Sequence, residues 1–250
     1  MYEIFRVNGQ SPLYEVQESD DLIIMCHGAK EATYQGVGFA NLILENIDQK
    51  IESVLSYFNE RQLPFVWYIG PDTKPSNLGD ILQEHGLKYS GGVAAMAIKI
   101  DELKLRHLPK DLTIETVQDR EQLRTFFDVW IESYPFPPSL GDIYYDIFTS
   151  KVFKLDYLNK FYVGYLEGNA VATSRVFYGK DLASLWWVST HPSARGRGIA
   201  TAMTINPLRD SQSYGYKMAS LFATNMGSYV YPKLGFKEYH KLGAYVWLPE

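Results

Sequence analysis

A short segment rich in glycine and arginine, residues 195–200, has the composition of an anion-binding loop. It reads RGRGIA and follows the apolar run 182–190 after a turn at Pro192. Glycines let the backbone approach a ligand, and the amide groups and positive dipole end of a helix that begins near Gly198 would face it. The pattern therefore predicts a phosphate or pyrophosphate site. The alternatives are a solvated basic turn and a loop that contacts RNA.

The elements that must position this loop follow from periodicity and turn residues in the second half of the chain. Residues 161–166 and 170–178 flank a turn at 167–169, which is typical of a hairpin. The segment 133–139 contains three prolines and predicts an irregular loop that forms a wall of the substrate site. The other expected elements are a helix at 121–134, strands at 182–190, 218–223 and 244–248, a helix from near Gly198, and a helical turn at 228–233.

The first half of the chain shows the same alternation of helices and strands. Its expected elements are a helix at 41–58, a strand at 64–69, a helix at 78–85 and a strand at 93–98. The charged segment 101–113 separates the two halves, so we place a domain boundary there, between 1–108 and 109–250. Aligning Gly86 with Gly235 superposes the ends of the two halves and indicates an internal duplication.

Residues 35–40, QGVGFA, repeat the spacing of the glycine-rich loop in the first half. The distance from Gly38 to Gly86 is longer than the matching distance in the second half, and Leu82 stands where the second half has Tyr231. We therefore expect no second anion site in the first half.

Composition and charge exclude several classes of protein. A chain of 250 residues with 46% hydrophobic residues can bury a sizeable core. Its net charge of −5 disfavours a nucleic-acid partner, because phosphate binding needs a concentrated basic surface. The single cysteine, Cys26, excludes an intramolecular disulfide, and no apolar run has membrane-spanning length, so we expect a cytoplasmic protein without a membrane partner. The histidines show no zinc-ligand spacing, and we expect no metal.

Two motifs in the second half together resemble those of the GNAT superfamily of acyl-CoA-dependent N-acetyltransferases. They are Arg-x-x-Gly-x-Ala at 195–200, after a strand, and Tyr-x-x-Leu-Gly-Phe at 231–236. The resemblance covers residues 111–250. The first half, with GPDTKPSNLG at 70–79, is similar to the degenerate N-terminal half of tandem-GNAT proteins.

The resemblance implies a fold of the α/β class, in detail an α+β GNAT-like fold with two tandem GNAT-like domains. Each domain would contain a mixed, mostly antiparallel central sheet flanked by helices. The degenerate domain would span 1–108 and the catalytic acetyltransferase domain 109–250. The implied reaction is transfer of an acetyl or other acyl group from acetyl-CoA to a primary amine by direct attack. The implied acceptor is a small-molecule amine or a peptide.

The resemblance also implies a set of site positions in the second half. The residues expected to bind coenzyme A are Val188, Thr190, Arg195, Gly196, Arg197, Gly198, Ile199, Ala200, Thr201, Thr224 and Asn225. Tyr231 is the implied general acid, because a phenol with a pKa near 10 can protonate the thiolate of a thiol with a pKa of about 8.5. The N–H of Val188 is the implied donor to the oxyanion. We expect Tyr134, Phe136 and Trp186 to contact the acceptor.

The sequence departs from the family pattern where a general base is often found. Family members often place glutamate or histidine two or four residues before the position of Val188, but Trp186 and Ser184 stand there. The remaining candidates for a base are Glu132, Asp128 and His191, or a chain of water molecules. Thr224 stands where many members have asparagine, so we expect altered contacts with coenzyme A.

These departures leave two other functions open. One is a non-catalytic protein of GNAT fold that binds acyl-CoA as a sensor or scaffold, in which Tyr231 is an ordinary packing residue. The other is acyl transfer to an alcohol or to a tRNA-linked amino acid. The negative charge of the chain argues against the tRNA-linked acceptor.

Overall fold

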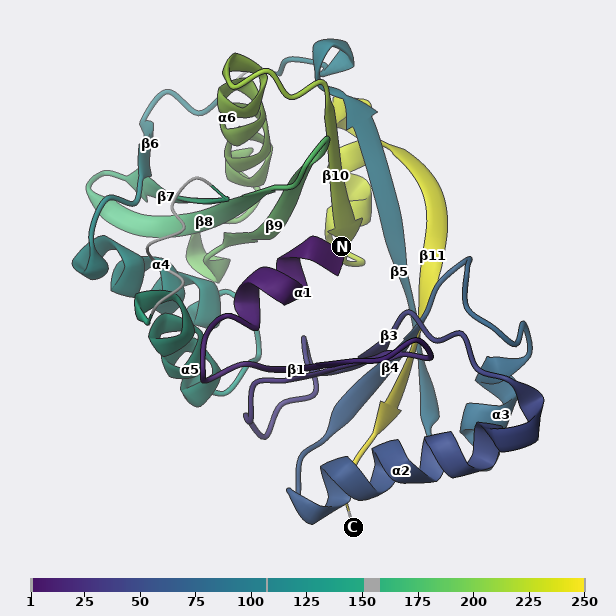
Figure 1. Ribbon diagram of the computed structural model, residues 1–250. Helices are drawn as coiled ribbons and strands as arrows, with labels where there is room; N and C mark the ends of the chain where they lie inside the picture. The colour runs from purple at the N-terminus through teal and green to yellow at the C-terminus, as the bar shows by residue number, and fades with distance from the viewer. Residues whose placement is uncertain (1, 107, 151–157, 250) are drawn as a thin grey trace. The chain divides into compact units, whose positions relative to one another are not determined.

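Helices and strands alternate in the computed structural model, which describes residues 2–106, 108–150 and 158–249 (Figure 1). The helices are α1 (Tyr2–Asn8), α2 (Ile47–Glu60), α3 (Leu78–Glu84), α4 (Arg120–Glu132), α5 (Pro138–Thr149), α6 (Ile199–Ser213) and α7 (Tyr231–Leu234). The strands are β1 (Glu15–Glu18), β2 (Ile23–Cys26), β3 (Gly36–Gly38), β4 (Phe65–Ile69), β5 (Lys88–Lys99), β6 (Leu112–Thr116), β7 (Asn159–Leu166), β8 (Asn169–Tyr178), β9 (Ala183–Thr190), β10 (Met218–Ala223) and β11 (Lys237–Trp247). The predicted mixed α/β class is confirmed.

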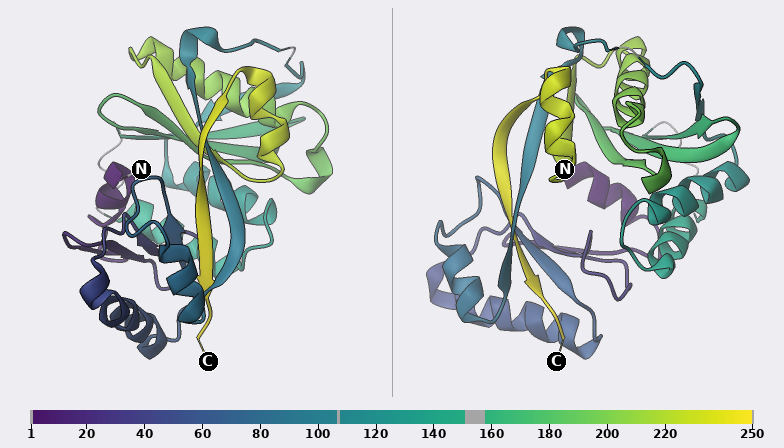
Figure 2. Two further views of the ribbon diagram at one scale, coloured as in Figure 1. Left: turned by 90° about the vertical axis from the view of Figure 1, so that its right-hand side faces the viewer. Right: turned by 180° about the vertical axis from the view of Figure 1, so that it is seen from behind.

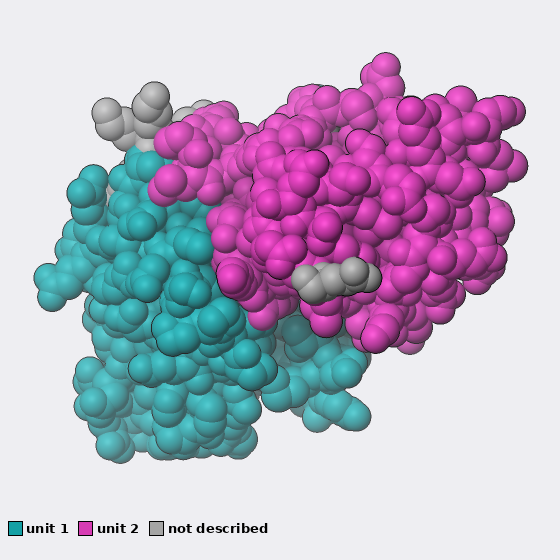
Figure 3. Space-filling view, turned by 90° about the horizontal axis from the view of Figure 1, so that it is seen from below, with its two compact units in different colours: residues 1–4, 94–239 teal, residues 5–93, 240–250 magenta. Residues whose placement is uncertain are grey.

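The chain forms two compact units, which Figure 3 shows in different colours. Unit 1 contains residues 1–4 and 94–239, and unit 2 contains residues 5–93 and 240–250. Apart from the first residues, the chain passes from one unit to the other within the long strands β5 and β11 (Figure 2). The limits of the units therefore differ from the predicted boundary between residues 108 and 109. As the division between two duplicated halves, that boundary stays a prediction.

In unit 1 the strands lie in the order β5, β10, β9, β8, β7 and β6. Neighbours are antiparallel except β9 and β10, which are parallel. Helix α6 contacts one face of β7, β8 and β9, and α4, which packs on α5, contacts the other face (Figure 1). Because β9 and β10 are parallel, the segments that follow them begin at the same edge of the sheet.

Apolar side chains hold these helices on the sheet of unit 1. On the α6 side, Leu185 and Met203 belong to one buried cluster. On the other side, the rings of α4 and α5 surround Trp187, and the centroids of Phe127 and Trp130 lie 5.8 and 4.9 Å from its ring. Strand β9 is therefore held firmly on both faces, which makes it a rigid support for a site at its end.

The predicted elements of the second half are present, with shifts at their ends, and two further elements, β6 and α5, were not predicted. Helix α4 begins at Arg120 because the Asp119 side chain accepts a hydrogen bond from Gln122 N–H at 2.9 Å as an N-cap. Helix α5 was not predicted, because the prolines of 133–139 suggested only a loop. Pro138 is its first residue, where the missing N–H would have no helical partner in any case.

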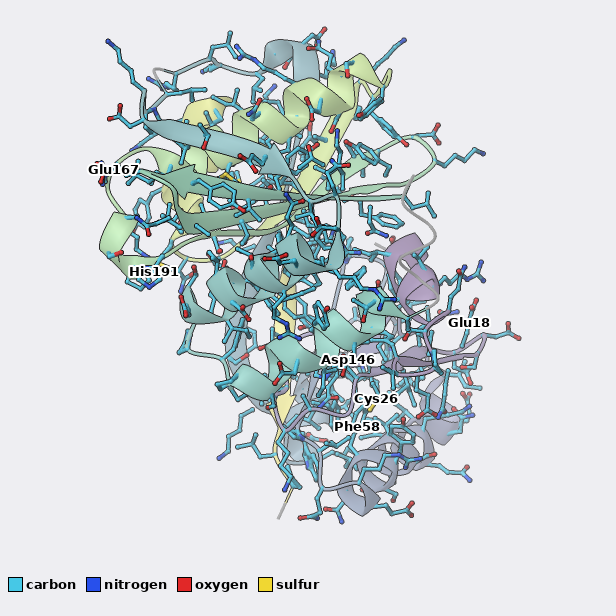
Figure 4. The ribbon with its side chains drawn as sticks, turned by 90° about the vertical axis from the view of Figure 1, so that its left-hand side faces the viewer. Glu18, Cys26, Phe58, Asp146, Glu167 and His191 are labelled. Atoms are coloured by element: carbon cyan, nitrogen blue, oxygen red, sulfur yellow. The ribbon has the colours of Figure 1, made fainter. Side chains whose placement is uncertain are left out.

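In unit 2 the strands lie in the order β1, β2, β3, β4 and β11, and only β3 and β4 are parallel. Helix α2 packs on this sheet through Ile51, Val54 and Phe58, which share one helical face. Figure 4 labels Phe58 and Cys26, two members of this core. Helix α2 begins later than the predicted residue 41, because a separate 3-10 turn, Leu44–Asn46, precedes it.

The two halves of the chain have the same topology. The series β3, α2, β4, α3, β5 matches the series β9, α6, β10, α7, β11. In each series the first two strands are parallel, and the last strand pairs antiparallel with the middle strand of the other series. This repetition agrees with the internal duplication expected from the sequence.

Candidate functional site

Strand β9 carries a β-bulge near its end. Thr173 of β8 pairs with Ser189, whereas Arg175 pairs with Trp186, so β9 holds one residue more than β8 between these pairs. Trp187 lies in this interval with a φ of 52°, a conformation that is uncommon for residues other than glycine. The bulge therefore changes the direction of the backbone just where the sequence predicts the acyl-transfer site.

The bulge also changes which side chains face α6. Leu185 and Val188 both pack on the cluster that contains α6, although regular alternation places residues three apart on opposite faces. The Thr173 hydroxyl donates to Trp187 O at 2.8 Å and lies 2.7 Å from Ser189 Oγ. The irregular backbone is therefore stabilised by buried polar contacts on the opposite face.

Strands β9 and β10 stop pairing well before they end. The parallel ladder joins residues 183–185 to residues 219–221. Strand β9 nevertheless continues to Thr190, and β10 continues to Ala223. Beyond Leu185, no strand among the described residues pairs with the edge of β9 that faces β10. We call this edge, at Val188 and Thr190, the open edge of β9.

The backbone of Thr190 points to the open edge. Thr190 is opposite Ala172, and the next residue, His191, donates its N–H to Val171 O at 2.8 Å. This pattern makes Thr190 a non-hydrogen-bonded position in the antiparallel ladder with β8. Its own N–H and C=O groups therefore point away from β8.

Side chains bind both carbonyl groups of the open edge. Val188 O accepts a hydrogen bond from the Tyr134 hydroxyl at 3.0 Å. Thr190 O accepts one from Arg195 Nε at 3.1 Å, and the same guanidinium donates to Ser133 O at 2.8 Å. The turn after α4 and the glycine-rich loop are thus both tied to β9.

The glycine-rich loop leads directly into the first turn of α6. Gly196 and Gly198 have φ values of 79° and 77°, which glycine adopts without strain. Gly198 is the N-cap of α6, no side chain caps the helix, and the first turn contains no acidic residue. The amides of Ile199, Ala200 and Thr201 thus begin a helix of 15 residues without a side-chain cap, which favours an anion.

The two arginines of the loop have different surroundings. The guanidinium of Arg195 is engaged by two main-chain carbonyls, as described above. Arg197 is exposed and makes no hydrogen bond or ion pair with the described residues. The geometry therefore gives Arg195 a positioning role and leaves Arg197 available to a ligand. Direct contact of either arginine with coenzyme A stays a prediction.

Tyr231 is buried at the first position of α7. Its ring contacts Phe236, with centroids 5.7 Å apart, and it lies so close to Gly227 that an added Cβ there would be 2.6 Å from a ring atom. Burial and, to a smaller extent, the nearby Tyr134 phenol raise the pKa of Tyr231 above its ordinary value. Tyr231 is therefore protonated throughout the neutral range.

Thr224 and Asn225 form the exposed turn between β10 and α7. Thr224 Oγ1 accepts a hydrogen bond from Gly227 N–H at 3.3 Å, and Ser228 Oγ donates to Asn225 O at 2.6 Å. These bonds shape the segment that leads to Tyr231. Contacts of Thr224 and Asn225 with coenzyme A stay predictions.

The three residues expected to contact the acceptor fall into two places. Tyr134 and Phe136 stack on each other in the turn after α4, with ring centroids 5.2 Å apart. Trp186 lies on the sheet, where its ring is 5.6 Å from that of Phe222 on β10. Tyr134 contacts Val188 O and lies near Tyr231, whereas contact of any of the three residues with an acceptor stays a prediction.

Two of the three candidates for a general base lie near each other. His191 Nε2 is 3.9 Å from Glu132 Oε2, and His191 Nδ1 is 2.7 Å from Ser193 Oγ. Figure 4 labels His191 at the end of β9. Asp128 instead forms an ion pair with Arg124 at 3.7 Å. Within the described ranges, no group of three or more metal-binding side chains is placed to hold an ion, and no helix has the length and apolar character of a membrane span.

Hydrogen bonds thus join Tyr134 to Val188 and Arg195 to Thr190 at the end of β9, and Tyr231 lies near the Tyr134 phenol. Sequence reasoning missed Gly227, whose lack of a side chain leaves room for the ring of Tyr231, the predicted general acid. It also missed the role of Ser133, which acts through a main-chain carbonyl that every residue type possesses.

Comparison with known proteins places these features in a family. A model of the acetyltransferase (GNAT) domain matches residues 114–238, which is half of the chain. No curated protein matches the sequence.

Several solved structures share the fold. A GCN5-related N-acetyltransferase from Kribbella flavida has 15% identity and a TM-score of 0.71, with 98% of this chain and 94% of that chain covered. A functionally unknown conserved protein from Staphylococcus epidermidis has 12% identity and a TM-score of 0.74, with 100% and 98% covered. A tandem GNAT protein from the clavulanic acid biosynthesis pathway has 11% identity and a TM-score of 0.63, with 98% and 87% covered. The predicted tandem arrangement therefore has a counterpart among solved structures.

Proposed function

Because this chain belongs to the GNAT family of acetyltransferases, we propose that it transfers an acetyl or other acyl group from acetyl-CoA to a primary amine. The transfer is a direct attack of the amine on the thioester carbonyl. The acceptor is a small-molecule amine or a peptide.

The observation that carries this proposal is the combination of the open edge of β9 with the uncapped start of α6. Coenzyme A consists of a pyrophosphate-containing nucleotide and an arm with amide groups. The amides from Ile199 to Thr201 and the exposed Arg197 suit the pyrophosphate. The backbone groups of Val188 and Thr190 suit an amide-containing arm that extends along an unpaired strand.

In the proposed reaction, Val188 N–H donates a hydrogen bond to the carbonyl oxygen as negative charge develops on it. The C–S bond then breaks, and Tyr231 protonates the departing sulfur and recovers its proton from solvent. The raised pKa keeps Tyr231 in the acid form needed for this step. The amine must lose a proton, and we assign this role to the pair formed by His191, which follows β9, and Glu132, at the end of α4.

A second candidate is a non-catalytic acyl-CoA sensor or scaffold. The observation that favours it is the lack of an acid–base side chain at Ser184 and Trp186. Ser184 Oγ lies 3.2 Å from Ser220 Oγ, and Trp186 packs on Phe222, so both positions serve the sheet. Under this alternative, coenzyme A binds but no amine releases free thiol from acetyl-CoA.

Calorimetric titration of acetyl-CoA and CoA into the protein, followed by an amine screen with thiol release as the readout, tests both candidates. Micromolar binding with thiol release supports the enzyme, and binding without release from any amine supports the sensor. If the folded protein binds neither ligand, both candidates fail. Arg197→Ala is the matched variant, because it removes the available cation and should weaken the binding of both ligands without changing the fold.

A further inference from the structure

The carbonyl groups of the open edge of β9 already have hydrogen-bond donors. Val188 O accepts a hydrogen bond from Tyr134, and Thr190 O accepts one from Arg195. The two contacts differ in kind. Arg195 belongs to the loop that directly follows β9, whereas Tyr134 comes from the turn after α4, which is 54 residues away in sequence.

The contact at Val188 therefore results from tertiary packing. The Tyr134 ring is half-buried and stacks on Phe136. The adjacent Ser133 carbonyl is fixed by Arg195, so the turn is held against β9 at two successive residues. Because burial raises the pKa of Tyr134, its hydroxyl keeps the proton that it donates to Val188 O.

An arm that extends along the open edge needs the same acceptor. In a strand-like arrangement, amide N–H groups of the arm donate to the carbonyls of the edge. A carbonyl oxygen that already accepts from the Tyr134 hydroxyl is a poorer partner for them. Removal of this hydroxyl would take the donor from Val188 O, and a partly buried acceptor that has lost its donor gains more from a new one.

We propose that Tyr134 is a placeholder for the acyl-donor arm: its hydroxyl occupies Val188 O in the free protein and gives up this acceptor to an amide N–H of the arm when the donor binds. This inference rests on the proposed function. Tyr134 thus sets the affinity for the donor, and its release alters residues 133–137, which belong to the predicted substrate wall at 133–139. No covalent change in Tyr134 is involved.

The test is calorimetric titration of two ligands into the wild-type protein and Tyr134→Phe. One ligand is CoA, and the other is 3′-phosphoadenosine 5′-diphosphate, which has the nucleotide and the pyrophosphate but no arm. Tyr229→Phe is the matched control, because Tyr229 lies in the same unit, is 74% exposed and forms no hydrogen bond through its hydroxyl to the described residues. Thermal unfolding of each variant confirms that it is folded.

If Tyr134 is a placeholder, Tyr134→Phe should bind CoA roughly three- to tenfold more tightly than wild type, the effect of one hydrogen bond. Its affinity for the armless nucleotide, and both affinities of Tyr229→Phe, should stay unchanged. Equal or weaker binding of CoA by Tyr134→Phe overturns the inference but leaves the proposed function standing. An equal increase in affinity for both ligands overturns it as well, because the arm of CoA would then not be responsible for the increase. If wild type binds neither ligand, the proposed function fails and the inference fails with it.

Discussion

The two halves of the chain carry the same glycine spacing, within β3 in the first half and after β9 in the second, and use it in opposite ways. In the second half, Gly198 is the N-cap of α6 beside an open strand edge. In the first half, Gly36 and Gly38 lie within β3, which pairs with β2 on one side, while Gly36 also pairs with β4 on the other. A Cβ on Gly36 would lie 1.8 Å from Val66 O, so this glycine permits close contact between strands.

The helices that follow these glycines, α6 and α2, differ in whether their N-terminal ends suit an anion. Helix α6 starts at once after Gly198 and has no acidic residue in its first turn. Helix α2 starts only at Ile47, after a 3-10 turn, and has Asp48 in its first turn. A carboxylate at that position interacts favourably with the helix dipole and repels an external anion. The glycine pattern thus indicates a ligand site only where the strand edge is open and the helix start is free.

The residues at matching positions show the same division. Arg195 binds main-chain carbonyls at the surface, whereas its counterpart Gln35 is fully buried and donates to Ala29 O and Pro64 O at 2.9 and 2.7 Å. Tyr231 faces the proposed reaction, whereas Leu82 is a core residue with 0% exposure. Residues of the first half serve packing where those of the second half serve the candidate site.

Substitutions of Tyr231 and its counterpart Leu82 are expected to give the largest contrast, because one should affect kcat and the other the free energy of unfolding. Tyr231→Phe should lower kcat by about a hundredfold or more, because it removes the proton donor, and should leave the affinity for CoA unchanged. Leu82→Ala should lower the free energy of unfolding by about 2–5 kcal/mol without changing the affinity of the folded protein for CoA. Steady-state kinetics with an acceptor from the amine screen and chemical unfolding measure these effects. Unchanged kcat in Tyr231→Phe would remove Tyr231 as the general acid.

The second-largest contrast is expected between substitutions of Gln35, which should affect stability, and of Arg195, which should affect CoA binding. Gln35→Ala should lower the free energy of unfolding by about 2–4 kcal/mol, since it leaves buried main-chain groups without partners. Arg195→Ala should change the stability by less than about 1 kcal/mol, because Arg195 is exposed, and should weaken CoA binding by loosening the glycine-rich loop. Unfolding curves and calorimetry measure both. The comparison breaks down if Arg195→Ala leaves the affinity for CoA at the wild-type value.

The matched glycines provide a smaller contrast. Gly198→Ala should weaken CoA binding roughly tenfold, because a left-handed conformation costs an L-residue about 1–2 kcal/mol and the loop would change to avoid it. Gly38→Ala should have no effect on binding, since the added Cβ meets only Met25 Cε at an ordinary 3.7 Å. Calorimetric titration of CoA into both variants measures the difference. Similar losses in the two variants would show that the glycines are not distinguished by their conformation.

The smallest effect concerns a pH dependence that belongs to unit 2. Burial opposes protonation of His85, but hydrogen bonds to Asp48 and Glu52 outweigh it and raise the pKa of His85. The raised pKa means that this contribution to stability is complete below the unfolded pKa of about 6.5 and is lost as pH rises through the folded pKa. Because both carboxylates are exposed, the change should stay below about 1 kcal/mol.

Hydrogen exchange of the α2 amides at mildly acidic and mildly alkaline pH measures this effect after correction for intrinsic exchange rates. Protection should fall as pH rises in the wild type and should stay level in His85→Gln. An equal fall in His85→Gln would assign the pH dependence to other groups. The amides of α6 in unit 1 provide an internal reference.

Much of the candidate site was predictable from local patterns. The apolar run before Pro192, the glycines at 196 and 198 and the tyrosine at 231 are features of short segments, and a strand, a tight loop and a helix start depend mainly on neighbouring residues. The order of most elements and the GNAT resemblance were available for the same reason. The limits of α2 and the existence of α5 were not, because 3-10 turns and proline at a helix start have the same composition as loops.

Tertiary structure decided what the site residues touch. The bulge at Trp187 forms where packing holds β8 and β9 in a register that leaves one extra residue in β9. No residue type in β9 predicts the positive φ of Trp187. The contacts from Tyr134 to Val188 and from Arg195 to Ser133 join residues separated by 54 and 62 positions. The pairing of β5 with β10 and of β11 with β4, which joins each half of the chain to the other, likewise depends on which strand edges remain to be paired. Such partners are selected by the packing of the whole unit, so local composition locates the candidate site, and the fold determines which of its groups are free to act.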